Sequence, residues 1–81
     1  MSVLEEIIDE RHSQGRKWGE QNHEPLYWLA ILMEELGEAA QIVIDDLAGI
    51  TAGNYRAELV QVAAVAVAAI ESWDRADLQI L

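Results

Sequence analysis

The 81-residue chain contains no cysteine. It can therefore form neither a disulfide nor a thiolate metal site. A chain of this length forms one domain, residues 1–81, and is only marginally able to build a core of its own. Yet 52% of its residues are hydrophobic, which is high for so small a body. We therefore expect a homodimer or homotetramer, since symmetric homo-oligomers are the common way to bury such surface.

Positive charge is also scarce. Fifteen acidic residues face five lysines and arginines, for a formal net charge of −10. Nucleic-acid backbones and anionic membrane surfaces attract proteins through lysine and arginine, so this balance argues against both classes of partner. A negatively charged protein can still bind a nucleotide when Mg²⁺ lies between the two. The basic residues are Arg11, Arg16, Lys17, Arg56 and Arg75.

Long apolar runs and a leader segment are likewise missing. The longest run without a charge, Leu59 to Ile70, is shorter than the roughly 20 residues of a membrane span. Met1-Ser2-Val3 leads directly into acidic residues rather than into a signal peptide. We expect a cytoplasmic protein.

The pattern predicts an all-α fold, a small bundle of three main helices with a C-terminal extension, completed by homo-oligomerisation. The first helix should run from Ser2 to Gln14, with Ser2 and Glu5 forming a capping box and Gly15 ending it. A polar connector, residues 16–24, would follow. The apolar stripe of the first helix is Val3, Leu4, Ile7 and Ile8, and its water-facing acids are Glu5, Glu6, Asp9 and Glu10.

The second helix should begin at Pro25, where a missing N–H is harmless, and end near Leu47. Its acidic side also carries Ile31 and Ile42, so we expect that side to be partly enclosed by another helix or subunit. The predicted core face is Leu29, Leu32, Leu36, Ala40, Val43 and Leu47. The acids of the opposite side are Glu34, Glu35, Glu38 and Asp45.

The third helix should run from about Tyr55 to Trp73, capped by Asn54 or Thr51 after a glycine-bounded turn. A continuation of this helix past Trp73 is an alternative, because Glu71 and Arg75 have the i,i+4 spacing of a helical ion pair. Residues 59–70 are apolar on every face except at one glutamine, which is typical of a buried helix. The apolar tail, residues 78–81, is expected to dock on a neighbour.

Carboxylates on helices this apolar require an explanation, because burying them is unfavourable unless another group compensates their charge. Glu35 and Glu38 lie three residues apart on one helix face, and Glu58 and Gln61 repeat that spacing on the next helix. If the two helices pack antiparallel, the two pairs converge. Crowded carboxylates destabilise one another, and a hard divalent cation removes that cost. Mg²⁺ is the expected ion, with Mn²⁺ as an alternative. The competing interpretation is a solvated acidic face with incidental spacing.

These segments resemble the MazG-like all-alpha NTP pyrophosphohydrolases, whose pattern is Glu-Glu-x-x-Glu, a spacer, and then Glu-x-x-Asp. Residues 34–38 match the first part fully, and residues 58–61 match the second except at the last position. The upstream segments, residues 16–23 and 28–33, are also similar to small members of the family. The resemblance covers most of the chain.

The resemblance implies a Mg²⁺-dependent enzyme that cleaves a nucleoside triphosphate between the α- and β-phosphates, releasing a nucleoside monophosphate and pyrophosphate, in keeping with a house-cleaning role. Glu35, Glu38 and Glu58 would be metal ligands, and Glu34 a further ligand or water-orienting base. Arg16 and Lys17 would take the remaining phosphate charge. Trp18, His23, Tyr27 and Trp28 are candidates to stack on the base, although each is also a candidate for a core or interface contact.

Gln61 departs from the family pattern. Its amide carbonyl can still bind Mg²⁺, but the site loses one negative charge. The alternative function is therefore a non-catalytic helical oligomerisation module, or a nucleotide- or metal-binding module with a degenerate site. A di-iron bundle is set aside because neither His12 nor His23 lies three residues after a glutamate of the cluster.

Overall fold

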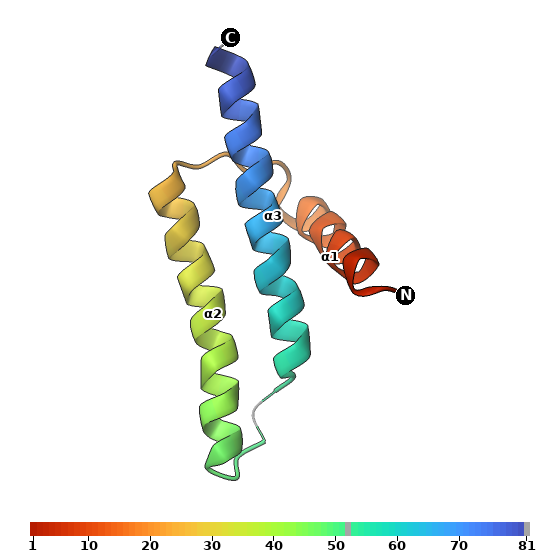
Figure 1. Ribbon diagram of the computed structural model, residues 1–81, viewed down its shortest axis with the longest axis vertical. Helices are drawn as coiled ribbons and strands as arrows, with labels where there is room; N and C mark the ends of the chain where they lie inside the picture. The colour runs from red at the N-terminus through yellow and green to blue at the C-terminus, as the bar shows by residue number, and fades with distance from the viewer. Residues whose placement is uncertain (52, 81) are drawn as a thin grey trace.

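A computed structural model describes residues 1–51 and 53–80, with the side chains of residues 1–51 and 53–76. Three helices and no strand are present in that part of the chain, which confirms the all-α class: α1 Val3–Trp18, α2 Pro25–Leu47 and α3 Tyr55–Ile80. α2 and α3 form an antiparallel hairpin, and α1 packs obliquely on α3 (Figure 1). α3 is thus the central element.

The start of α1 follows the prediction, but its end does not. The Ser2 hydroxyl accepts a hydrogen bond from the Glu5 backbone N–H, and the Glu5 carboxylate accepts one from the Ser2 N–H. The helix then continues through Gly15 for another turn and ends at Trp18. Gly19 is the C-cap, and its φ of 72° is a conformation that favours glycine. An isolated glycine inside a helix costs only about 1 kcal/mol, so Gly15 does not stop it.

The bounds of α2 are those predicted from the sequence, with Pro25 in the first turn. The predicted core face is wrong within the single chain. Leu29, Leu36, Ala40, Val43 and Leu47 are exposed, and of that set Leu32 alone is partly buried. The side that packs on α3 is the acidic side, with buried Trp28 and Ala39 and half-buried Ile31, Glu35 and Ile42.

α3 begins as predicted, because the Asn54 side chain accepts a hydrogen bond from the Ala57 N–H. It continues past Trp73 to Ile80, which resolves the question left open by the Glu71–Arg75 spacing. Arg75 does not pair along the helix with Glu71: it binds the connector before α2, and Glu71 binds Arg11 of α1. The predicted docking of the apolar tail lies outside the described residues.

The core of the described chain is small. Its buried apolar residues are Trp28, Ala39, Ala64, Val65 and Ala68. Most of these come from α3, where alanines allow the neighbouring helices to approach closely. The prediction that residues 59–70 are buried on all sides holds for one face of α3, because Leu59, Val67 and Ile70 remain exposed. Among the described residues, no helix combines the length and apolarity that crossing a lipid bilayer would need.

Polar contacts attach the connector, residues 19–24, to α3. The Ser72 hydroxyl, in a residue that is 3% exposed, accepts a hydrogen bond from the His23 N–H at 3.2 Å. The Arg75 guanidinium donates to the Asn22 side chain at 2.8 Å and to the Gln21 carbonyl at 3.0 Å. Two ion pairs, Arg11–Glu71 and Arg56–Glu6, fasten α1 to α3. The connector therefore has a fixed path over the end of the hairpin.

Candidate metal and nucleotide site

Three of the four carboxylates singled out from the sequence converge. Glu35 and Glu38 project from successive turns of α2 toward Glu58 of α3, and one carboxylate oxygen of each lies within 4.8 Å of the others. The antiparallel hairpin produces this meeting, because the middle of α2 lies beside the first turns of α3 (Figure 1). Oxygens that share an octahedral Mg²⁺ at 2.0–2.1 Å are about 3 to 4 Å apart, so small side-chain rotations would suffice.

Two oxygens of this cluster lack a partner. Glu35 Oε2 and Glu58 Oε2 are buried and accept no hydrogen bond from the described residues. A buried polar atom without a partner costs about 1 to 3 kcal/mol, and more when it carries charge. The donor set therefore fits a hard cation, which prefers carboxylate oxygens as ligands.

The electrostatics point the same way. Burial raises the pKa of Glu35 above its usual value of 4.5, and the neighbouring charges of Glu38 and Glu58 raise the pKa further. Glu34 and Glu10 add smaller contributions of the same sign. Repulsion among carboxylates at close range is the condition that a divalent cation relieves.

A cavity of about 320 Å³ adjoins Glu35, between α1, α2 and α3. Its apolar lining residues include Trp28, Ile31, Val65 and Ala68. Its polar lining residues include Ser13, Gln14, Lys17, Gln21 and Gln61. A lining of apolar and hydrogen-bonding side chains, beside a carboxylate cluster, suits a small aromatic ligand whose negative charge is bound through a cation.

Glu10 is the site residue that sequence reasoning missed. It was expected to face water, but it is half-buried, lines this cavity and acts on the pKa of Glu35. The available signal was the polar face of the first helix, where positions 10, 13, 14 and 17 fall at helical spacing. Glu10 could not be recognised as a cavity residue from the sequence, because nothing in the sequence shows that this face of the first helix packs over the α2–α3 hairpin.

The predicted substrate-binding residues separate into two groups. Lys17 and Trp18 line the cavity, with the Lys17 ammonium 4.7 Å from the centre of the Trp18 ring. Arg16 faces away and lies with His12 in a shallow hollow on the other side of α1. Gln61 lines the cavity with Glu35, whereas Glu34 is exposed and outside the converging cluster.

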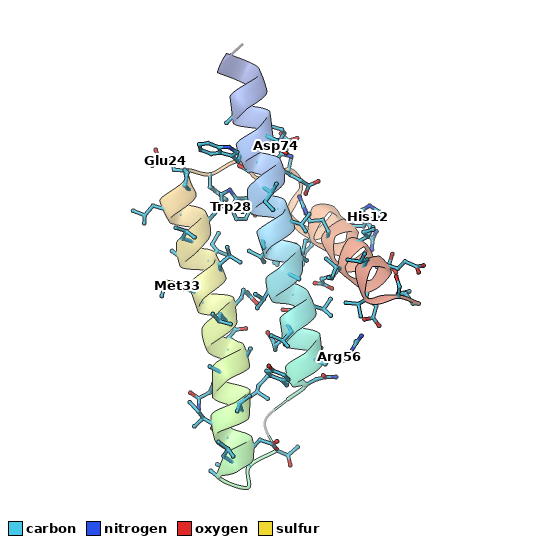
Figure 2. The ribbon with its side chains drawn as sticks, viewed as in Figure 1. His12, Glu24, Trp28, Met33, Arg56 and Asp74 are labelled. Atoms are coloured by element: carbon cyan, nitrogen blue, oxygen red, sulfur yellow. The ribbon has the colours of Figure 1, made fainter. Side chains whose placement is uncertain are left out.

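His23 and Trp28 belong to one aromatic group. The His23 ring lies 4.4 Å from the Tyr27 ring and 4.9 Å from the Trp28 ring, measured between centres. Trp28 is 5% exposed and sits between α2 and α3 (Figure 2), so it forms part of the cavity wall rather than an open stacking platform. His23 does not line this cavity; it borders the apolar groove on the other side of Trp28.

No family model, curated protein or solved structure gives a significant match to the chain.

Proposed function

We propose that the protein is a Mg²⁺-dependent nucleoside triphosphate pyrophosphohydrolase, acting in the cytoplasm on (d)NTPs. The observation that carries the proposal is the convergence of Glu35, Glu38 and Glu58 from two helices, with two buried oxygens lacking partners. The resemblance of residues 34–38 and 58–61 to the MazG-like family supplies the reaction. Mn²⁺ is the expected substitute for Mg²⁺.

Glu35, Glu38 and Glu58 would hold the cation, with the Gln61 carbonyl as a weaker neighbour. A bound Mg²⁺ would supply charge neutralisation for the triphosphate and a water of lowered pKa. Lys17 lines the cavity. In this proposal its ammonium group, a flexible point charge, would contact the phosphates. Arg16 is left out of this role because it lies on the far side of α1.

Glu10 could replace the acid that the family pattern has at position 61. Where the family pattern has Asp, Gln61 brings no charge, yet Glu10 of α1 lines the same cavity. We propose that Glu10 supplies the additional carboxylate on that side, either to orient water or to hold a metal-bound water. Glu34, exposed on α2, is the second candidate for the water-orienting base.

The base of the nucleotide would occupy the cavity over Trp28, Ile31 and Val65. The cavity is also lined by the amide side chains of Gln14 and Gln21, which both donate and accept hydrogen bonds, as the edge of a nucleobase requires. Trp18 next to Lys17 is a candidate to cover the open side of the base.

The alternative function is a non-catalytic helical module that binds a nucleotide or a metal. Two observations favour it: the neutral Gln61 within the site, and the exposed apolar residues of α2. In either function we propose a homo-oligomer, because the small core of the described chain leaves much apolar surface uncovered.

The test is pyrophosphate release from a panel of NTPs and dNTPs with Mg²⁺ or Mn²⁺. We compare the wild type with Glu38→Gln and with Glu24→Gln as the matched control. Glu24 is the N-cap of α2 and lies at one end of that helix (Figure 2), whereas Glu35 and Glu38 lie in its middle. We expect the wild type and the control to release pyrophosphate, and Glu38→Gln to lose at least 100-fold of that activity. A loss of this size corresponds to a few kcal/mol of activation free energy, on the order expected when a metal ligand is removed. Absence of release from every nucleotide favours the binding module.

A further inference from the structure

Arg75 of α3 binds three consecutive residues of the connector. The connector links α1 to α2 and crosses α3 on the way (Figure 1). The Arg75 guanidinium donates a hydrogen bond to the Gln21 carbonyl at 3.0 Å and another to the Asn22 side chain at 2.8 Å. It also lies 3.5 Å from the Glu20 carboxylate. A planar guanidinium with several fixed N–H groups is suited to hold such a segment at more than one point.

Ser72 adds a second, buried attachment one turn before Arg75. Its hydroxyl accepts a hydrogen bond from the His23 N–H at 3.2 Å, and the residue is 3% exposed. Within the described part of the chain, Ser72 and Arg75 provide the only hydrogen bonds that join residues 20–23 to another element. Residues 20–23 have no regular secondary structure. These side chains of α3, rather than a helix, therefore determine where the backbone of the connector runs.

Gln21 relates this attachment to the cavity. Arg75 binds the backbone carbonyl of Gln21, whereas the Gln21 side chain lines the cavity of about 320 Å³ together with Trp28 and Val65. The side-chain amide is thus left for a ligand. An amide both donates and accepts hydrogen bonds, and its position decides which base edge it can pair with. A connector that moved by about 1 Å would misplace this group, and shifts of that size can change enzyme rates greatly.

Glu71 shows how Arg75 becomes available to the connector. The spacing of the two residues would allow an ion pair along α3, but Glu71 instead accepts a hydrogen bond from Arg11 of α1 at 2.7 Å. Arg11 itself lines the cavity. Residues 71–75 of α3 therefore attach both α1 and the connector, which each contribute side chains to the cavity wall.

Arg75 is remote from the carboxylate cluster. Glu58, the acid that α3 contributes to the cluster, lies in the first turn of that helix. A helix rises roughly 1.5 Å per residue, so Arg75 lies about 25 Å further along the axis of α3. Neither Ser72 nor Arg75 lines the cavity. Their loss is expected to leave the binding of a cation unchanged and to act on the base alone.

We propose that Arg75 and Ser72 are positioning residues of the nucleotide site: they hold the connector so that the Gln21 amide contacts the base and sets the base preference. This inference rests on the proposed function, since it assigns the base to the cavity. The competing explanation is that both residues only close the fold. In that case their loss would lower stability without changing the preference among nucleotides.

The experiment measures the preference ratio, which we define as the highest kcat/KM in a panel of NTPs and dNTPs divided by the lowest. The variants are Arg75→Met, which keeps an unbranched stem without donors, Gln21→Ala and the double variant. We expect each single variant to lower the ratio by roughly 10-fold, the size of one lost hydrogen bond. The double variant should lose no more than Gln21→Ala alone, because Arg75 acts through Gln21.

Arg56→Met is the matched control. It removes an arginine ion pair of the same kind, with Glu6, at the other end of α3 and away from the connector. This control should keep the preference ratio of the wild type. Ser72→Ala removes the acceptor for the His23 N–H and should lower the ratio in the same direction as Arg75→Met, which gives a second variant if the first folds poorly. Thermal melts with Mg²⁺ should show the same gain in Arg75→Met as in the wild type.

The outcomes separate this inference from the reaction. An active wild type whose preference ratio is unchanged in Arg75→Met and Ser72→Ala, or that has no preference, overturns the positioning role and leaves the pyrophosphohydrolase standing. So does a double variant whose loss is the product of the two single losses. Calorimetric titration with Mg²⁺ and the α,β-imido analogues of the same nucleotides covers an inactive wild type. A binding preference that Arg75→Met abolishes then supports the positioning role and contradicts the hydrolase, and no binding overturns both.

Discussion

The carboxyl group of Glu35 is both partly buried and close to other negative charges. Its side chain is partly enclosed by α3, and its oxygen Oε2 has no hydrogen-bond partner. Burial raises the pKa of its carboxyl, as do the charges of Glu38 and Glu58. Without a cation, ionised Glu35 is therefore less stable in the folded chain than in the unfolded one.

This gives a pH dependence of stability. A carboxyl whose pKa is raised on folding contributes stability below its unfolded pKa, near the usual value of 4.5, and that contribution is lost as pH rises through the folded pKa. Without divalent metal, we expect Glu35→Gln to be more stable than the wild type at neutral pH, and the advantage to shrink as pH falls toward 4.5. Thermal melts of the two proteins in chelator across this range measure it. An advantage that does not change with pH would contradict the raised pKa.

Helical spacing predicts that Glu35 and Glu38 share one face of α2, and the expected antiparallel packing of the two helices does bring Glu58 of α3 close to them. The sequence did not predict that Glu10 lines the cavity and that Arg16 does not. Their placement depends on how α1 rotates against α3, which the Arg11–Glu71 and Arg56–Glu6 pairs set across about fifty residues or more of sequence. Such long-range contacts leave no local signal.

At the scale of elements, the end of α1 shows how local rules compete. Gly15 is a plausible helix stop by residue type, but the helix continues to Trp18, with Gly19 as its C-cap. Arg16 and Lys17 then occupy the last turn, where positive charge interacts favourably with the helix dipole. The consequence for the site is direct, because the added turn carries Lys17 and Trp18 to the cavity.

The two glycines should respond oppositely to alanine. Gly15→Ala replaces a glycine inside a helix, and the new methyl group would meet only the Arg11 side chain at 4.0 Å. We expect a gain of about 0.5 to 1 kcal/mol in the free energy of unfolding. Gly19→Ala forces a left-handed φ of 72° on alanine and should lose about 1 to 2 kcal/mol. Urea unfolding of both variants measures the difference. The reverse order would mean that α1 ends at Gly15.

α2 shows why a helical wheel cannot by itself assign a core. The helix has two sides able to be buried: the predicted core face with Leu29 and Leu36, and the acidic side with Trp28, Ile31 and Ile42. A helical wheel ranks the predicted core face first because it is more apolar. The chain packs the acidic side on α3 and leaves the predicted core face exposed. The clue was Ile31 and Ile42, two large apolar residues among acids.

At the scale of the molecule, the hairpin of α2 and α3 is the unit that brings the acids together, and α1 closes one side of the cavity. The all-α class and the helix order could be read from periodicity and capping residues. The oblique path of α1 and the exposure of the predicted core face of α2 could not, since both depend on contacts outside any one helix. The homo-oligomer we propose would supply the burial that the small core lacks.

The most direct test of the metal site is thermal unfolding with and without Mg²⁺ or Mn²⁺, for the wild type, Glu38→Gln and the control Glu24→Gln. A ligand at 100 times its dissociation constant stabilises a folded protein by about 2.7 kcal/mol. In a domain of this size each kcal/mol raises Tm by roughly 4 to 8 °C. We expect the wild type and Glu24→Gln to gain stability with the metal and Glu38→Gln to gain little. Equal behaviour of all three proteins would contradict a metal held by Glu35, Glu38 and Glu58.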